Sequence, residues 1–304
     1  MTIRIMVSRH SAFYSPLICS IAAGFFEQEN LEATYGILGK GQRSHILIRD
    51  GIVDVMQSAV SSNWKPMEQR ESPLPVHFAQ INQRDGFFIA GRHAEPDFKW
   101  SHLRGKTLLA DHGLQPLVML RYAAHYNGVD WSKIHVVDAG SPEEMDAAFR
   151  AGTGDYVHLQ APAPHQLEYD GVGQIVTSVG ASMPRVAFSS LCASREFIEG
   201  PMFSAFLRAY TKAREWVRQA PPGEIAATEA SFFPGTELQS LAAAIARYQS
   251  LGCWDGGVEI PRDLYEQSLN VFEFAREIRI RHPHDAVCLS PLPHSRAGEG
   301  PAYT

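Results

Sequence analysis

Short apolar runs alternate with helix-like patterns along residues 2–190. The first run, residues 2–7, predicts a strand, and Ser15-Pro16 then supplies an N-cap and a first helical residue before apolar side chains at helical spacing. Further strands are predicted at residues 31–38, 53–56, 76–81, 87–90, 106–110, 133–137, 156–159, 175–178 and 186–190. This alternation is typical of α/β proteins with mostly parallel sheets, whose ligands bind beyond the carboxyl ends of the strands.

Helical patterns separate these strands and then dominate the C-terminal part of the chain. Pro116 opens a helix that ends at Asn127-Gly128, and Ser141 caps another whose first turn carries two acids at the positive end of the helix dipole. Further helices are predicted at residues 42–49, 203–218, 236–249 and 263–280. Residues 282–304 contain several prolines and glycines and predict a flexible tail.

Size and charge narrow the function classes. The 304 residues are 45% hydrophobic and 20% charged, which is sufficient for two globular domains. A net charge of -6 gives no electrostatic reason to expect nucleic acid as a partner. The apolar stretch 17–26 is too short to span a bilayer, and we expect no direct membrane insertion. No export signal precedes the first strand, so we expect a cytoplasmic protein as written, or a periplasmic one if a leader was removed.

The residues that usually hold metals or cofactors form no recognisable motif. The four cysteines, Cys19, Cys192, Cys253 and Cys288, contain no CxxC pair and are expected to be buried free thiols. The thirteen histidines show no HExxH and no tight cluster with carboxylates. No Walker loop, GxSxG elbow or GxGxxG motif is present either. The sequence therefore predicts neither a metal nor a cofactor.

Five segments, taken in order, resemble a known family. They are residues 10–32, 49–55, 98–106, 145–156 and the group Trp254, Ile260-Pro261 and Tyr265. The first ends its helix in Gly24-Phe25-Phe26, as in a "GFF-x-x-x-x-L-x" turn. The next three are similar to "L-x-x-G-x-x-D-V", "dLkGKkv" and "al-x-x-G-x-vDA" segments. Together they resemble the SsuA/THI5-like (NMT1/THI5-like) substrate-binding proteins over residues 3–280.

This resemblance implies an α/β fold of the two-lobed type II periplasmic-binding-protein class, with mixed, mostly parallel sheets flanked by helices. Two hinge crossovers are expected near residues 85–88 and 185–190. Lobe one would be residues 1–86 and 190–304, and lobe two residues 87–189. The resemblance further implies a cleft that closes over a small organic ligand, of the sulfonate, nitrate-like, pyrimidine or aromatic-acid class, with an ABC permease as a possible partner.

Loops after the strands, with polar residues near the crossovers, are the candidate ligand-binding positions. The loop after the first strand offers an imidazole and a phenol, the turn before Pro116 offers free amides, and the serines after residue 57 allow close approach of a ligand. The candidates are His10, Ser11, Tyr14, Ser58, Ser61, Gln80, Asn82, Asp111, His112, Gly113, Gln115, His158, Gln160 and Met183. Each could instead be a cap, a turn or a core residue. Scarce arginine in these loops favours a neutral or weakly anionic, partly planar ligand.

An enzyme on the same scaffold is the alternative. His10 or His112 would be the acid or base, and Asp111 would orient an imidazole, in decarboxylation, desulfination or dehydration of a small acid. The missing export signal favours this alternative, and a ligand sensor without catalysis is a third hypothesis. Cys19 lies on the apolar stripe of the first helix and is a poor nucleophile. The cysteine cluster of the related pyrimidine synthases of thiamine biosynthesis is absent.

Overall fold

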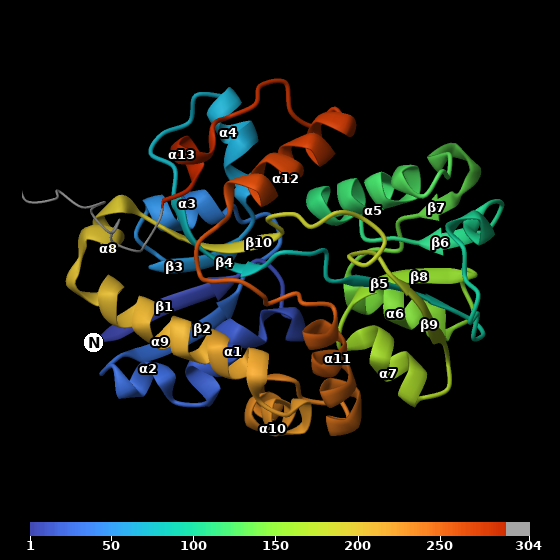
Figure 1. Ribbon diagram of the computed structural model, residues 1–304, viewed down its shortest axis with the longest axis horizontal. Helices are drawn as coiled ribbons and strands as arrows, with labels where there is room; N and C mark the ends of the chain where they lie inside the picture. The colour runs from blue at the N-terminus through green and yellow to red at the C-terminus, as the bar shows by residue number, and fades with distance from the viewer. Residues whose placement is uncertain (290–304) are drawn as a thin grey trace, which may run out of the picture.

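The computed structural model, described for residues 1–289, contains two five-stranded mixed sheets, each flanked by helices (Figure 1). The first sheet has the order β2-β1-β3-β10-β4, in which β1 is parallel to β2 and β3 while β10 is antiparallel to β3 and β4. Its strands are β1 (Thr2–Val7), β2 (Glu32–Ile37), β3 (Val55–Ser58), β4 (Val76–Asn82) and β10 (Ser189–Ala193). The predicted two-lobed α/β fold is confirmed.

The second sheet repeats the arrangement of the first. Its order is β7-β6-β8-β5-β9, with β6 parallel to its neighbours and β5 antiparallel to its own. Its strands are β5 (Phe87–Gly91), β6 (Thr107–Leu109), β7 (His135–Val137), β8 (Tyr156–Gln160) and β9 (Gln174–Ser178). In each sheet the first strand after the chain crosses over, β5 or β10, runs antiparallel to its neighbours. This gives the mixed sheets that were predicted.

Most of the helices pack around the first sheet. They are α1 (Ser15–Ala22), α2 (Phe25–Gln28), α3 (Ser44–Arg49), α4 (Trp64–Glu68), α8 (Arg195–Glu199), α9 (Pro201–Gln219), α10 (Pro222–Glu229), α11 (Leu238–Ser250), α12 (Arg262–Phe274) and α13 (His284–Val287). The second sheet carries α5 (Leu114–Tyr126), α6 (Pro142–Arg150) and α7 (Ala163–Tyr169). Short 3-10 turns η1 (Ala12–Tyr14), η2 (Val60–Asn63), η3 (Trp100–Leu103), η4 (Trp131–Lys133) and η5 (Ala230–Phe232) complete the described elements.

Two local signals in the sequence have different outcomes. Ser141 accepts a hydrogen bond from the Glu144 backbone, and the Glu144 carboxylate accepts one from the Ser141 backbone, so the predicted helix start is a full capping box. The first helix, predicted to run through Phe25, instead ends at Ala22. Gly24 adopts a left-handed φ of 73° there, which an α-helix cannot contain, and α2 begins after it.

The chain crosses between the sheets twice. The chain leaves the first sheet at Asn82 and enters the second at Phe87. It leaves the second sheet at Ser178 and returns to the first at Ser189. We propose lobe one as residues 1–86 with 190–304 and lobe two as residues 87–189. The two crossings touch, because a Cβ atom on Gly180 would overlap the backbone carbonyl of Asp85. Glycine is therefore required where the crossings meet.

Helices from the C-terminal part of lobe one lie against lobe two on both sides of the crossings. Figure 1 shows α11 beside α7 and α12 beside α5, and these pairs are in contact. The Tyr248 hydroxyl in α11 donates to the Gly86 carbonyl at 2.8 Å and accepts from the Ala161 amide at 3.1 Å. In α12 the Leu264 carbonyl accepts from the Ala187 amide at 3.1 Å.

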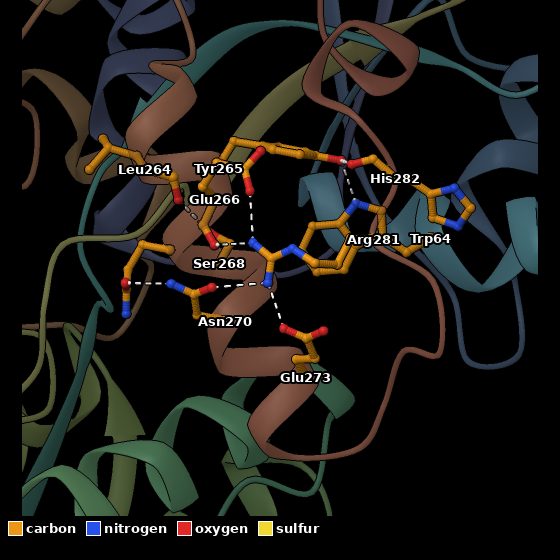
Figure 2. A network of polar contacts seen from close by, with 10 residues as sticks. Trp64, Leu264, Tyr265, Glu266, Ser268, Asn270, Glu273, Arg281 and His282 are labelled. Atoms are coloured by element: carbon orange, nitrogen blue, oxygen red, sulfur yellow. Dashed lines mark hydrogen bonds and ion pairs between the residues drawn. The ribbon is translucent and has the colours of Figure 1, made fainter.

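A polar network fastens α12 to the segment that follows it (Figure 2). The Arg281 guanidinium pairs with the carboxylates of Glu266 at 2.7 Å and Glu273 at 2.5 Å. The Tyr265 hydroxyl accepts from the Trp64 indole at 3.0 Å and donates to the carbonyl of His282 at 2.9 Å. The start of the predicted tail is thus held by defined contacts and contains α13, whereas residues 290–304 lie outside the described part of the chain.

A carboxyl group is enclosed between α1 and α10. Glu229 is fully buried, and its carboxyl oxygens accept hydrogen bonds from the Ser15 hydroxyl at 2.9 Å and the Cys19 thiol at 3.4 Å. Burial raises the pKa of Glu229 to about 8, since the charged form would lose its hydration.

No helix within residues 1–289 has the length and hydrophobicity needed to cross a membrane.

The crossing contact predicts a steric penalty at Gly180. Gly180→Ala should lower the free energy of unfolding by roughly 1–3 kcal/mol, because the new methyl group must displace the Asp85 backbone. Urea denaturation measures this change. Gly223→Ala is the control, since a Cβ atom there meets no neighbour within 4 Å. Equal stability of the two variants would contradict the tight crossing.

The pKa of Glu229 predicts a pH-dependent effect of Glu229→Gln. Between about pH 4.5 and pH 8 the folded protein holds a proton that the unfolded chain has released, so the wild-type free energy of unfolding falls as pH rises. The free energy of unfolding of the variant should not fall in this way, because glutamine does not ionise. It should match the wild type near pH 4.5 and exceed it by roughly 2–4 kcal/mol near pH 8 in urea denaturation.

Glu224→Gln, on the exposed side of α10, is the control for this comparison. Its stability relative to the wild type should not rise across the same pH range. A constant difference between Glu229→Gln and the wild type at every pH would show that folding does not raise the pKa of Glu229.

Candidate functional site

A pocket of about 280 Å³ opens between the two sheets, beside the chain crossings. Larger hollows of about 540 and 1060 Å³ exist elsewhere on the protein, but this one gathers the carboxyl ends of strands from both sheets. It is lined by Ser8, Arg9, Tyr14, Gln57, Ser58, Ala59, Ser61, Ser62, Phe87, Leu114, Gln115, Pro116, Gln160, Phe188 and Ser189. Its position makes it the candidate binding site.

Five of the residues predicted from the sequence line this pocket: Tyr14, Ser58, Ser61, Gln115 and Gln160. They come from η1, the β3–η2 segment, the first turn of α5 and the end of β8. The Ser61 hydroxyl donates to the Gln115 side-chain carbonyl at 2.6 Å, which links the two lobes across the pocket. The Gln115 side-chain amide in turn donates to the carbonyl of Phe188 at 2.7 Å.

Several predicted residues lie outside the pocket lining and bind the backbone instead. The Ser11 hydroxyl donates to the carbonyl of Ala161 at 2.6 Å. The Gln80 amide donates to the carbonyl of Gly257 at 2.6 Å, and the Asn82 amide donates to a carbonyl in η1 at 3.0 Å. These contacts hold the segments around the crossings in place. Met183 is buried, and Gly113 precedes α5 as its N-cap residue.

His10 points away from the pocket. Its Nδ1 lies 2.8 Å from the Tyr35 hydroxyl and its Nε2 2.7 Å from the carbonyl of Phe232. The ring also stacks on Phe233, with 4.6 Å between centroids. Burial lowers the pKa of His10. The side chain therefore ties the loop after β1 to η5.

The neighbouring residue Arg9 was missed by the sequence analysis. It lines the pocket, its guanidinium lies 5.4 Å from the centre of the Phe87 ring, and it forms an ion pair with Asp111 from the other lobe. The available signal was position, because Arg9 follows β1 by two residues and so stands at the carboxyl end of a parallel strand. The sequence candidates also did not include Gln57, Phe87 and Ser189, which lie at strand ends, or Ser62, which lies in η2.

Two predicted residues on β8 are buried without hydrogen-bond partners. Neither the Nε2 nor the Oε1 atom of Gln160 makes a hydrogen bond of standard geometry within the described residues, although the Tyr14 hydroxyl lies nearby. Both ring nitrogens of His158 also lack a partner there, and its ring stacks on Phe87 at 4.4 Å. Burial lowers the pKa of His158 to about 3, so the ring is uncharged at neutral pH.

The structure does not bring together the groups needed by the catalytic alternative. Asp111 faces the Arg9 guanidinium rather than an imidazole. The His112 ring instead lies 2.8 Å from the carbonyl of Ala110, with its Nδ1 3.9 Å from the carboxylate of Asp138. The described residues that line the pocket include no histidine, cysteine or carboxylate. No acid–base pair is therefore assembled at the pocket.

The cysteines are not among the described residues that line the pocket, and they form no metal site with other side chains there. Cys19 is buried against Glu229, and burial raises the pKa of its thiol, which disfavours the nucleophilic thiolate. The other three cysteines, Cys192, Cys253 and Cys288, are free and buried as well. Within residues 1–289, no three histidine, cysteine or acidic side chains are grouped so that they could hold a metal ion.

Known proteins share both sequence and fold with this chain. The family model described as NMT1/THI5 like matches residues 12–224. YtlA of Bacillus subtilis (strain 168), whose name describes a binding protein, is 28% identical over 245 residues, which cover 79% of this chain and 73% of YtlA.

Solved structures extend the comparison to the fold. The ligand-binding component of an ABC-type import system from Staphylococcus aureus, with zinc bound, has a TM-score of 0.75 at 14% identity and covers 95% of this chain and 97% of its own. The alkanesulfonate-binding protein SsuA from Xanthomonas axonopodis pv. citri, bound to MOPS, has a TM-score of 0.72 at 15% identity, covering 95% and 98%. At such identities the likeness shows the fold alone.

The resemblance found in the sequence is thus confirmed independently by a family model and by the arrangement of both sheets. The model match covers most of the chain, from the turn η1 through strands β2–β10, and includes both crossings. This protein belongs to the NMT1/THI5-like family and has its two-lobed substrate-binding fold.

Proposed function

We propose that this protein is the substrate-binding protein of an ABC-type import system and holds a small organic solute in the pocket between its lobes. The observation that carries the proposal is the side-chain amide of Gln160, which is 6% exposed, lines the pocket and makes no hydrogen bond of standard geometry within the described residues. A buried amide without partners is costly, and a ligand that hydrogen-bonds to it removes that cost.

The walls of the pocket support closure over the ligand. Tyr14 and Ser58 belong to the proposed lobe one, while Leu114 and Gln160 belong to lobe two. A ligand that contacts both sets stabilises the closed arrangement more than the open one, because only the closed form provides all the contacts. Family membership and the shared fold of import proteins support the same conclusion.

The lining also indicates a ligand class. Phe87 and Phe188 provide apolar aromatic surface, whereas Ser58, Tyr14 and Gln160 provide hydroxyl and amide groups. A volume of about 280 Å³ suits a small, partly planar molecule with a few polar atoms. The proposed ligand therefore belongs to the sulfonate, pyrimidine or aromatic-acid class.

Transfer to an ABC permease and a location outside the cytoplasmic membrane complete the proposal, since an import receptor must meet its ligand there. Cell fractionation of the native organism tests the location. Product analysis after incubation with a bound ligand tests the enzyme alternative, because a binding protein returns the ligand chemically unchanged.

Gln160→Met should separate ligand binding from stability. The methionine side chain has a volume similar to that of glutamine but no strong hydrogen-bonding groups. The ligand-free variant should therefore be at least as stable as the wild type. Ligands found by a thermal-shift panel of sulfonates, pyrimidines and aromatic acids should bind the variant roughly 10–100-fold more weakly in calorimetry. For the wild type, a ligand at 100 times its Kd should add about 2.7 kcal/mol of stability.

Gln249→Met is the matched control. The Gln249 amide donates to the carbonyls of Val217 at 2.8 Å and Ala220 at 2.9 Å, and Gln249 is not among the residues that line the pocket. This variant should lose stability and keep its ligand affinity. Unchanged affinity in Gln160→Met, with ligand bound elsewhere, would refute the proposed site.

A further inference from the structure

The one charge that the described residues bring to the pocket lining is paired with an opposite charge from the other lobe. Arg9 is the one charged residue among the described residues that line it. The carboxylate of Asp111, on the loop after β6, forms an ion pair with the Arg9 guanidinium. The Asp111 side chain is 6% exposed and that of Arg9 23%, so water screens this pair only weakly.

Asp111 also faces a second group that attracts anions, the start of α5. Amide N–H groups in the first turn of a helix lack intrahelical acceptors and carry partial positive charge. Leu114 and Gln115, in this first turn, line the pocket. The Asp111 Oδ1 accepts the Gly113 amide at 2.7 Å, directly before that turn. The carboxylate thus occupies the position beside both positive groups that an anionic ligand would take.

We infer that Asp111 sets the ligand specificity of the pocket, which selects uncharged polar molecules over their anionic counterparts. The inference rests on the proposed function. Among its ligand classes it favours neutral molecules, such as pyrimidines and the amide or sulfonamide counterparts of the acids, over ionised sulfonates and aromatic acids. An entering anion must either displace Asp111 from Arg9 and leave a buried carboxylate unpaired, or lie beside that carboxylate. Both arrangements are unfavourable at low exposure to water.

A neutral ligand avoids this conflict and still finds hydrogen-bonding groups. The Gln160 amide offers one donor group and one acceptor without partners among the described residues. Within the described residues Arg9 contacts the Asp111 carboxylate and the Phe87 ring, and its remaining N–H groups can donate to a carbonyl or sulfonyl oxygen of a ligand. An amide presents a donor and an acceptor side by side, which matches the Gln160 side chain.

The wild-type protein and Asp111→Asn test this inference with two pairs of probes. Calorimetry compares benzamide with benzoate and benzenesulfonamide with benzenesulfonate. The wild type should bind the neutral member of each pair at least about tenfold more tightly. Asparagine keeps a side-chain oxygen for the Gly113 amide but removes the charge, so the preference should shift toward the anion by about tenfold or more.

Asp138→Asn is the matched control. Asp138 accepts the amide of Gly140 at 3.0 Å, in the same Asp-x-Gly arrangement as at Asp111, but its side chain is 58% exposed. The control removes the same charge and should leave the probe preferences unchanged. The double variant Arg9→Gln, Asp111→Asn should lose the gain in anion affinity, because the guanidinium that attracts the anion is gone.

The outcomes separate the inference from the proposed function. Tighter binding of the anionic probes by the wild type overturns the inference while the pocket remains a binding site. Equal shifts in Asp111→Asn and Asp138→Asn also overturn it, since they would reflect overall charge alone. If all four probes fail to bind every protein at millimolar concentration, both the inference and the proposed function are contradicted. The wild-type comparison needs no variant and therefore does not depend on how Asp111→Asn folds.

Discussion

The hydroxyl group of Tyr248 sits where the two lobes and both of their connections meet. It donates to the carbonyl of Gly86 in the first crossing and accepts from the amide of Ala161 at the end of β8. Burial raises its pKa, so the group remains a donor. The contact between Gly180 and the backbone of Asp85 joins the two crossings next to it. This junction helps to fix the relative position of the pocket walls, together with the contacts of α11 with α7 and of α12 with α5.

Strand β8, which ends at the pocket, carries polar side chains that the folded chain does not satisfy by itself. Gln160 and His158 are buried on β8 with side-chain atoms that lack partners in the described structure. Core positions of this kind normally carry apolar residues, because unpaired polar groups lower stability. Their presence beside a cavity is the pattern expected where stability is given up for ligand binding. Fold and function are thus connected through residues that weaken the free protein.

The ligand is decided by loop residues and not by the fold. Proteins of this fold include a sulfonate-binding protein with MOPS bound and an import component with zinc bound. Their sheets superpose on those of this chain, yet the groups that contact a ligand lie after the strands, where sequence varies freely. Here the ion pair between Arg9 and Asp111 neutralises the pocket. A substitution at either position would change the ligand class without changing either sheet.

The sequence by itself determined the order of the strands, the capped helix at Ser141 and the family, because these depend on local periodicity, capping chemistry and the order of segments. The bounds were less well determined, since the last strand, predicted at residues 186–190, is β10 at Ser189–Ala193. It also indicated the loops that form the pocket. Only the tertiary structure decided which side chain in each loop enters it. His10 was chosen from the loop after β1, but η5, more than 200 residues away, binds that ring, and Arg9 turns inward toward Asp111. Such choices depend on partners distant in sequence, which periodicity cannot reveal.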